Sequence, residues 1–320
     1  MGGETQDQGR AGLYRSLEPR VGRLHLDQRL GVEADREHLV FGQGRNFFHL
    51  ENWYSVHAVI RHSLRLVGMH GRGRRNARRI DVRRNEFTLP RLPDAFDGFT
   101  ILQLSDMHLD MDDAFPGVVS ARVRDLEYDL CVLTGDFRYL TAGPIEGALD
   151  GMRRLRANLS GTVYGILGNH DSIRMVPALE AMGVRMLLNE SVVLRRGDAS
   201  VHLAGIDDPH YYRADNFERA RTGIPPDAAS LLLAHSPEVY KQAAHAGFDV
   251  MLCGHTHGGQ ICLPGGVPLM LNAKCPRRVC RGAWRHHGMQ GYTSAGTGSS
   301  VVDVRLNNRP EVTLHRLRRG

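Results

Sequence analysis

Between residues 100 and 255 the chain repeats one pattern, in which a short apolar run stops abruptly at a glycine or a polar residue. The runs occupy residues 101–104, 130–133, 163–167, 201–204, 231–233 and 250–253. Runs this short that do not alternate with polar residues are typical of strands buried on both faces. Helical patterns lie between some of them, at residues 115–128, 146–159, 175–182 and 238–246. Buried strands that alternate with helices predict an α/β layered domain.

Side chains that commonly bind metal ions follow the carboxyl ends of five of these predicted strands. In chain order they are Asp106, His108, Asp136, Asn169, His170, His235, His255 and His257. Taken singly, an aspartate after a strand is usually a turn or cap residue, and a histidine usually packs in the core or on the surface. That interpretation would require such residues to occur by chance after five separate strands. Because α/β sheets place their sites at the carboxyl ends of strands, we predict that these side chains converge on a metal centre.

The mixture of ligand types indicates the kind of ion. Imidazole nitrogens suit zinc, manganese and iron, whereas carboxylate and amide oxygens suit harder ions. A site that mixes them fits two neighbouring divalent ions. Gly135, Gly168 and Gly254 each stand just before a candidate ligand. A glycine lets the backbone turn sharply there and approach an ion without a clash from its own side chain.

The order of the blocks resembles that of a known superfamily. D-x-H at Asp106, G-D at Asp136, G-N-H-D at residues 168–171, a lone histidine and then G-H-x-H resemble the calcineurin-like metallophosphoesterases. GHTHGGQ with AHSPE upstream resembles the bacterial YkuE- and YaeI-type branch, which includes a UDP-2,3-diacylglucosamine pyrophosphatase. The resemblance covers residues 80–320 and implies a four-layer α/β/β/α sandwich, with two mixed sheets flanked by helices. Where the branch often has an arginine-glycine pair, this chain has Ala295 and Gly296.

The resemblance also implies roles for individual residues. One ion is held by Asp106, His108 and His257. The other is held by Asn169, His235 and His255, and Asp136 bridges the two ions. The resemblance favours manganese, with zinc or iron as alternatives.

The charges of such a centre suggest its chemistry. Two divalent ions carry more positive charge than the two aspartate ligands neutralise, so the centre should attract a phosphate group. A hydroxide held between the ions would then attack phosphorus in line. The resemblance implies that His170 aids the leaving group as a general acid and that Asp171 orients its imidazole; alternatively, His170 only hydrogen-bonds the phosphate. Asp207 and Asp208 follow another strand end, where they either shape the pocket or cap a turn.

The N-terminal part differs from the rest in charge and pattern. We predict an N-terminal extension over residues 1–75, whose first 45 residues form a poorly ordered tail, and a catalytic domain over residues 76–320. Apolar residues between 53 and 67 have helical spacing, and nine arginines and one acidic residue lie between residues 61 and 84. Such a basic amphipathic segment, residues 53–84, either lies on an anionic membrane surface or docks on the body of the protein.

These observations predict a metal-dependent phosphodiesterase or pyrophosphatase, with a lipid-linked or nucleotide-sugar phosphoester as its substrate. The alternatives are a nuclease, suggested by the arginines although they lack interleaved aromatic residues, and a non-catalytic scaffold of the same fold. Five cysteines, an odd number, fit a reducing compartment. No run approaches the roughly 20 apolar residues of a membrane span. We therefore expect a cytoplasmic protein, with peripheral attachment to the inner membrane face; the sequence identifies no obligate protein partner.

Overall fold

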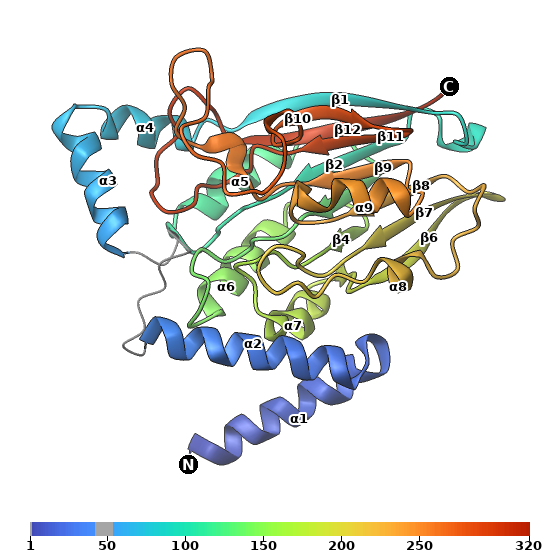
Figure 1. Ribbon diagram of the computed structural model, residues 1–320, viewed down its shortest axis with the longest axis horizontal. Coiled ribbons are helices and arrows are strands. Elements are labelled where there is room, and N and C mark those ends of the chain that lie inside the picture. Colours follow the sequence, from blue (N-terminus) through green and yellow to red (C-terminus); the bar gives the residue numbers. More distant parts are fainter. Residues whose placement is uncertain (1, 42–53) are drawn as a thin grey trace.

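Two six-stranded mixed sheets form the centre of the molecule in the computed structural model, which describes residues 2–41 and 54–320 (Figure 1). The first sheet has the order β1-β12-β2-β3-β4-β5. Its strands are β1 (Asp81–Leu89), β12 (Glu311–Arg319), β2 (Thr100–Leu104), β3 (Leu130–Leu133), β4 (Val163–Gly165) and β5 (Val184–Met186). Strands β2 to β5 are parallel, β12 is antiparallel to β2, and β1 is parallel to β12.

The second sheet has the order β10-β11-β9-β8-β7-β6. Its strands are β10 (Gly282–His286), β11 (Met289–Thr293), β9 (Val250–Cys253), β8 (Ser230–Leu233), β7 (Ala199–Gly205) and β6 (Glu190–Arg196). The four middle strands are parallel, and the edge strands β10 and β6 are antiparallel to their neighbours. Six strands of the two sheets, β2, β3, β4, β7, β8 and β9, correspond to the six apolar runs of the sequence.

Helices cover the outer face of each sheet. Apolar side chains from the facing sides of the sheets, among them Ile101, Val132, Leu203 and Leu231, form one buried cluster. The first sheet is covered by α5 (Phe115–Val123), α6 (Glu146–Arg156) and α7 (Val176–Ala181), and the second by α8 (Phe217–Arg221) and α9 (Tyr240–His245). Short 3-10 turns lie at Asp94–Phe96, Ile173–Met175, Pro237–Val239, His257–Gly259 and Arg277–Val279. The layers confirm the α/β/β/α sandwich.

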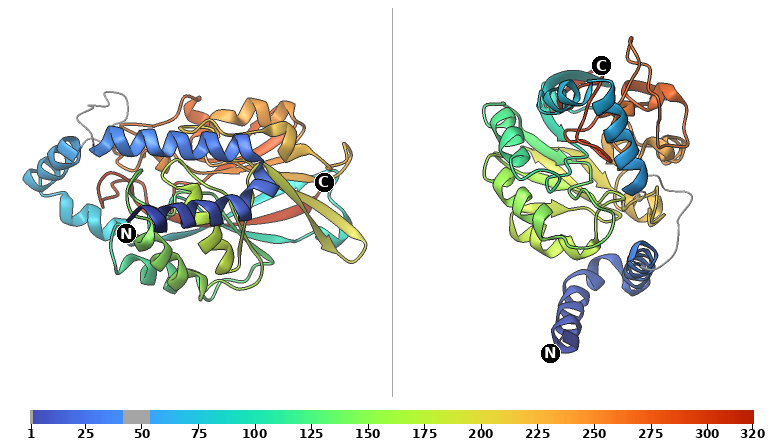
Figure 2. Two further views of the ribbon diagram at one scale, coloured as in Figure 1. Left: turned by 90° about the horizontal axis from the view of Figure 1, so that it is seen from below. Right: turned by 90° about the vertical axis from the view of Figure 1, so that its left-hand side faces the viewer.

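The N-terminal residues form two helices, so the prediction of a poorly ordered tail is wrong for residues 2–41. Helix α1 (Gly2–Val21) and helix α2 (Arg23–Phe41) lie outside the sandwich (Figure 2). Their buried stripe mixes apolar with charged side chains: Leu13, Leu17, Val21, Leu26, Arg29, Leu30, Glu33 and Arg36. The charged members interrupt the apolar period, which hid the helices from sequence analysis. The rest of the predicted tail, residues 1 and 42–45, falls outside the described residues.

Ion pairs fix the α1–α2 hairpin to the edge of the sandwich. Arg20 contacts Glu180 in α7 at 2.7 Å, Glu190 in β6 at 2.6 Å and the Met186 carbonyl in edge strand β5 at 2.7 Å. The hairpin therefore reaches the edge strands of both sheets. Further along, the Arg29 guanidinium lies 3.3 Å from the Asp207 carboxylate and 3.1 Å from that of Glu33. Arg29 and Asp207 are both buried, so each depends on the other for charge neutralisation.

Replacing Arg29 with methionine should lower the free energy of unfolding by about 3–5 kcal/mol, because it leaves the buried Asp207 without its main counter-charge. Burial alone would raise the pKa of Asp207, but Arg29 and His25 outweigh it and hold that pKa below its ordinary value. The stabilisation is therefore present at neutral pH and is lost as the pH falls through the lowered pKa. Urea unfolding measures the change. The matched control is Arg23→Met, which removes an exposed arginine of the same helix and should have little effect.

Two further helices precede the first strand. Helix α3 (Tyr54–Leu66) lies at one end of the sandwich and agrees with the helix predicted near residues 53–67, although Trp53 falls outside the described residues (Figure 1). Helix α4 (His70–Ala77) docks on the body, where the carbonyl of Gly73 accepts a hydrogen bond from the Arg305 amide at 3.0 Å. Among the described residues no helix is long and apolar enough to cross a membrane.

Candidate metal centre

The candidate ligands follow the ends of five strands and lie close together between the two sheets. Asp106 and His108 follow β2, Asp136 follows β3, Asn169 and His170 follow β4, His235 follows β8, and His255 and His257 follow β9. All eight residues are buried, and none is more than 6% exposed. The structure therefore brings together every candidate ligand that the sequence pattern singled out.

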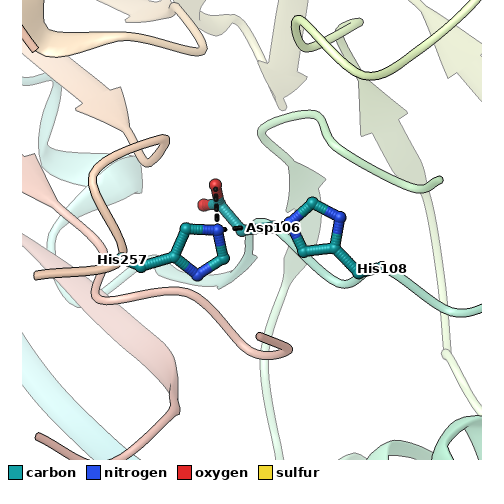
Figure 3. A group of neighbouring side chains, drawn as sticks. All are labelled: Asp106, His108 and His257. Atoms are coloured by element: carbon teal, nitrogen blue, oxygen red, sulfur yellow. Dashed lines mark hydrogen bonds and ion pairs between the residues drawn. The ribbon is translucent and has the colours of Figure 1, made fainter. Parts of the chain in front are cut away.

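The first cluster combines residues of the first and the last ligand motifs of the sequence. Asp106, His108 and His257 each offer one ligand atom, and these atoms lie within 4.8 Å of one another (Figure 3). The Nε2 atoms of the two histidines are 3.2 Å apart, and Nε2 of His257 is 3.4 Å from Oδ1 of Asp106. The cluster offers one oxygen and two nitrogens, a set that suits a divalent metal ion.

The second cluster is arranged around the side-chain oxygen of Asn169. Nδ1 of His255 lies 2.8 Å and Nε2 of His235 lies 3.0 Å from this oxygen. Asp136, His235 and His255 also form a group of ligand atoms within 4.8 Å of one another. Oxygen and nitrogen donors from four loops thus meet in a second buried group beside the first.

Hydrogen bonds to the backbone fix which nitrogen of each ring faces the centre. Nδ1 of His108 donates to the Arg138 carbonyl, Nδ1 of His235 donates to the Thr134 carbonyl, and Nε2 of His255 donates to the Asn272 carbonyl, at 2.6 to 2.8 Å. In a neutral ring the opposite nitrogen carries a lone pair. Burial lowers the pKa of His108 and His255, so these rings are neutral, whereas Asp136 outweighs burial and raises the pKa of His235 well above its ordinary value. At Asn169 the lone pair of Nδ1 of His255 points at the side-chain oxygen, an arrangement of two acceptors that a cation stabilises. The residues present thus fit metal ions.

Asp136 lies between the two clusters. Its Oδ2 is 3.3 Å from Nε2 of His235 and 4.0 Å from Nε2 of His108. Burial, together with the neighbouring carboxylates of Asp171 and Asp106, raises the pKa of Asp136 to about 7, although His235 partly opposes this shift. Burial likewise raises the pKa of Asp106. Burying several acids together is costly unless a positive charge lies among them, which again favours bound cations.

The backbone is strained at most of the candidate ligands. Left-handed φ angles occur at Asp106 (50°), His108 (45°), Asp136 (57°), His255 (69°) and His257 (49°). This region costs a residue other than glycine about 1–3 kcal/mol, and such residues concentrate at functional sites. Surrounding bonds hold the strain: the His255 amide donates to Oδ1 of Asp106 at 2.9 Å, and the His108 amide donates to the Asp136 carbonyl at 3.0 Å.

Two glycines permit the close approach of these loops. A Cβ atom on Gly168 would lie 2.2 Å from Oδ1 of Asp136, and one on Gly254 would lie 1.9 Å from Oγ of Ser105 and 2.3 Å from Oδ2 of Asp106. Any side chain at either position would collide with a candidate ligand. The glycines before the ligand motifs therefore have the steric role that the sequence suggested.

The prediction that Asp171 orients the His170 imidazole is wrong. Nδ1 of His170 donates instead to the Tyr139 carbonyl at 2.6 Å. The Asp171 carboxylate accepts backbone N–H groups of Asp136, Phe137, Arg138 and Gly168 at 2.8 to 3.2 Å. Because the amides of four residues donate to this carboxylate, it has no lone pair directed at an imidazole. It holds the loops that follow β3 and β4 together instead. Asp171 therefore positions the loop that carries Asp136.

The two aspartates after β7 have different roles. Asp207 pairs with Arg29 and His25 of the N-terminal hairpin. The Asp208 carboxylate accepts the backbone amides of His210, Tyr211 and Tyr212 at 2.7 to 3.2 Å, which is the capped turn that the sequence left as one alternative.

Arg305 also supports the centre, although no sequence pattern indicated it. Its buried guanidinium donates to the carbonyls of His257 at 2.9 Å and Ala295 at 2.7 Å, so it holds the loop that carries His257. Burial lowers the pKa of Arg305 to about 10. Its sequence context, VDVRLNN, resembles an ordinary surface loop and gives no signal of this role.

Comparison with known proteins agrees with this geometry. The family model described as calcineurin-like phosphoesterase matches residues 99–259, which contain every candidate ligand. The chain belongs to this family. It is therefore a metal-dependent phosphoester hydrolase, as the motifs predicted.

The relatives also confirm the bacterial branch of the calcineurin-like phosphoesterases. "Uncharacterized metallophosphoesterase YkoQ" of Bacillus subtilis is 31% identical over 230 residues, which are 68% of this chain and 83% of that protein. "Uncharacterized metallophosphoesterase YkuE" of the same organism is 28% identical over 239 residues, 71% of this chain and 82% of that protein. "Phosphodiesterase YaeI" of Escherichia coli is 28% identical over 228 residues, 68% of this chain and 81% of that protein.

Proposed function

We propose that this hydrolase uses two divalent ions, preferably manganese, to cleave a phosphodiester or a pyrophosphate. The observation that carries the proposal is the convergence of imidazole lone pairs with the oxygens of Asp106, Asp136 and Asn169 in two adjacent buried clusters. When bound, two such ions polarise a phosphoryl oxygen and activate a water as the nucleophile. The name of the relative YaeI, a phosphodiesterase, supports the diester alternative.

Each cluster would hold one ion. Asp106, His108 and His257 would hold the first. Asn169, His235 and His255 would hold the second, and Asp136, whose carboxylate lies between the clusters, would contact both. The carbonyls that fix the three histidine rings keep these lone pairs directed at the ions.

His170 would act on the leaving group. Its Nε2 lies 3.9 Å from Oδ2 of Asp136 and faces the centre, because Nδ1 donates to the Tyr139 carbonyl. Burial, His108 and Arg36 lower the pKa of His170 well below its ordinary value, so the ring is neutral before substrate arrives. An anionic phosphate beside the ring would raise this pKa and allow Nε2 to carry the proton that the leaving oxygen needs.

Metal analysis and a substrate screen test the proposal together. The purified chain should bind close to two manganese ions and, with manganese, hydrolyse an aryl phosphodiester. The screen should compare that diester with an aryl monoester, UDP-diacylglucosamine and single-stranded DNA. A chain that binds no transition metal, and stays inactive when manganese, zinc or iron is added, would favour the non-catalytic scaffold.

The finer proposal is a lipid-linked or nucleotide-sugar substrate at the inner face of the membrane. Helix α3 and the residue that follows it expose apolar side chains: Val59 and Val67 are 64% exposed and Leu66 is 90% exposed. Arg61 and Arg65 of the same helix are also exposed. An exposed apolar face with neighbouring arginines suits an anionic membrane surface, and it makes α3 the candidate anchor.

The chain should be retained by vesicles that contain phosphatidylglycerol and not by phosphatidylcholine vesicles, because arginines near an anionic surface contribute about 1 kcal/mol each. The double variant Val59→Asp, Leu66→Asp should lose this retention in a sedimentation assay. Val193→Asp is the matched control, since Val193 is an exposed apolar residue of β6. Absence of wild-type retention at moderate salt would contradict membrane attachment.

The structure gives the nuclease alternative no specific support. Arg74 and Arg78 pair with Asp303, and Arg83 lies 3.4 Å from Asp81. Arginines that already neutralise acids of their own chain attract nucleic-acid phosphates less strongly.

A further inference from the structure

Two arginines of helix α2 occupy similar positions seven residues apart. Arg29 and Arg36 are each 1% exposed. The Arg29 guanidinium lies 3.2 Å from the ring centroid of Tyr212, and that of Arg36 lies 3.6 Å from the ring centroid of Tyr211. Consecutive tyrosines of the β7 loop thus stack on arginines two helical turns apart, so the two guanidinium groups share the same kind of environment.

The two arginines differ in their hydrogen-bond partners. Arg29 contacts the carboxylates of Asp207 and Glu33 and donates to the Asp171 carbonyl at 3.1 Å. Nη1 of Arg36 donates to the Asn169 carbonyl at 2.7 Å. Its Nε and Nη2 are buried without an acceptor in the described part of the chain, and no carboxylate of that part forms an ion pair with Arg36.

A buried guanidinium with unused donors is unfavourable unless an anion completes it. Nε–H and one N–H of Nη2 point in the same direction along one edge of the planar group. Two parallel donors of this kind match two oxygens of a phosphate group. The two unused donors of Arg36 therefore have the geometry of a phosphate site.

The position of Arg36 connects this edge to the candidate metal centre. Its acceptor is the carbonyl of Asn169, and the side-chain oxygen of the same residue meets His235 and His255. The next residue is His170, the candidate general acid, whose Nε2 faces the centre. An anion on Arg36 would therefore lie beside the place where the reacting phosphate is expected.

We propose that Arg36 binds two oxygens of a substrate phosphate group, so that the N-terminal hairpin supplies part of the substrate site. The inference rests on the proposed function, because it takes the metal centre as the place of reaction. Inorganic phosphate, the simplest ligand with these oxygens, is a suitable probe. Since Nε and Nη2 are shielded from solvent, the end of α2 must shift slightly as phosphate enters.

The test measures phosphate affinity by calorimetry and thermal stability without phosphate, on the manganese-loaded full chain. Arg36→Met should weaken phosphate binding by roughly tenfold to a hundredfold, the effect of losing charged hydrogen bonds. Its melting temperature without phosphate should stay the same or rise, because the variant removes unpaired buried donors. Arg36→Lys keeps the charge but not the paired donors, so its affinity should fall between the two.

Arg20→Gln is the control, because Arg20 helps to fix the same hairpin but lies on α1 beside Glu180 and Glu190. Its phosphate affinity should equal that of the wild type. The inference is overturned if the wild type binds no phosphate, if Arg36→Met binds it as tightly as the wild type, or if Arg20→Gln weakens it equally. Hydrolysis of an aryl phosphodiester by the wild type separates failure of the Arg36 subsite from failure of the proposed function. If the wild type is active and Arg36→Met binds phosphate unchanged, only the Arg36 subsite is refuted. If the wild type binds no manganese or is inactive, the proposed function is refuted.

Discussion

Asp136→Asn should abolish hydrolysis, with kcat/KM falling by at least about a thousandfold. The carboxylate lies between the two clusters, 3.3 Å from His235 and 4.0 Å from His108, so both candidate ions depend on its charge. Metal ions contribute several kcal/mol to the stabilisation of a phosphoryl transition state, and about 4 kcal/mol corresponds to three orders of magnitude in rate. Metal analysis of the purified variant should show that at least one ion is lost.

The control for this prediction is Asp150→Asn, which removes an exposed aspartate of α6. It should retain metal and activity. The free energy of unfolding of metal-free Asp136→Asn should equal or exceed that of the metal-free wild type, because an amide avoids a buried negative charge. An Asp136→Asn variant that keeps two ions and wild-type turnover would contradict the bridging role.

The raised pKa of Asp136 gives a pH dependence with a definite sign. The folded, metal-free protein holds this proton up to about pH 7, whereas the unfolded chain releases it near pH 4. The contribution of Asp136 to the stability of the metal-free protein should therefore fall as the pH rises from about 4 to 7, and comparison with Asp136→Asn isolates it from the buried histidines, whose lowered pKa values act in the opposite direction. Manganese competes with the same proton, so the rise in melting temperature that manganese causes should grow over this interval. A metal effect that is independent of pH would show that Asp136 is not a ligand.

Most of the candidate centre could be predicted from sequence because its residues lie next to strand ends. A buried strand is visible as a short apolar run, and the residue after it must lie at the edge of the sheet. Asp106 and His255 lie two residues after the ends of such strands, and Asp136 lies three residues after. The glycines beside them were informative for the same reason, since only a residue without a side chain fits at Gly168 and Gly254.

The features that could not be predicted from the sequence depend on contacts between distant segments of the chain. Arg305 and Arg29 are buried cations whose acceptors lie in loops far along the chain, and an arginine in a polar segment has the same local pattern whether it is buried or exposed. The N-terminal helices were missed because charged residues occupy their buried stripe. The role of Asp171 was misassigned because neighbours in sequence, His170 and Asp171, point to different partners in the fold.

His170→Ala should lower kcat by about 10²–10⁴-fold, the contribution of a positioned acid or base, while the metal content stays at the wild-type value. Nε2 of His170 faces the centre and lies within 4.8 Å of ligand atoms of His108 and Asp136, but His170 is not a proposed ligand of either ion, and the Tyr139 carbonyl holds its ring. The loss should be larger for a diester with an alkyl leaving group than for a nitrophenyl diester, because a nitrophenolate leaves without a proton. His245→Ala, at an exposed position at the end of α9, is the control.

The two roles open to His170 differ in their pH profiles. As a general acid the imidazole must be protonated in the substrate complex, so the kcat of the wild type should fall on the alkaline side and this limb should be missing in His170→Ala. If the ring only hydrogen-bonds the phosphate, both leaving groups should lose the same factor and the alkaline limb should remain. Because burial, His108 and Arg36 all lower the pKa of the free ring, the general-acid role requires the substrate anion to restore the proton. Turnover near the wild-type value in His170→Ala would exclude both roles.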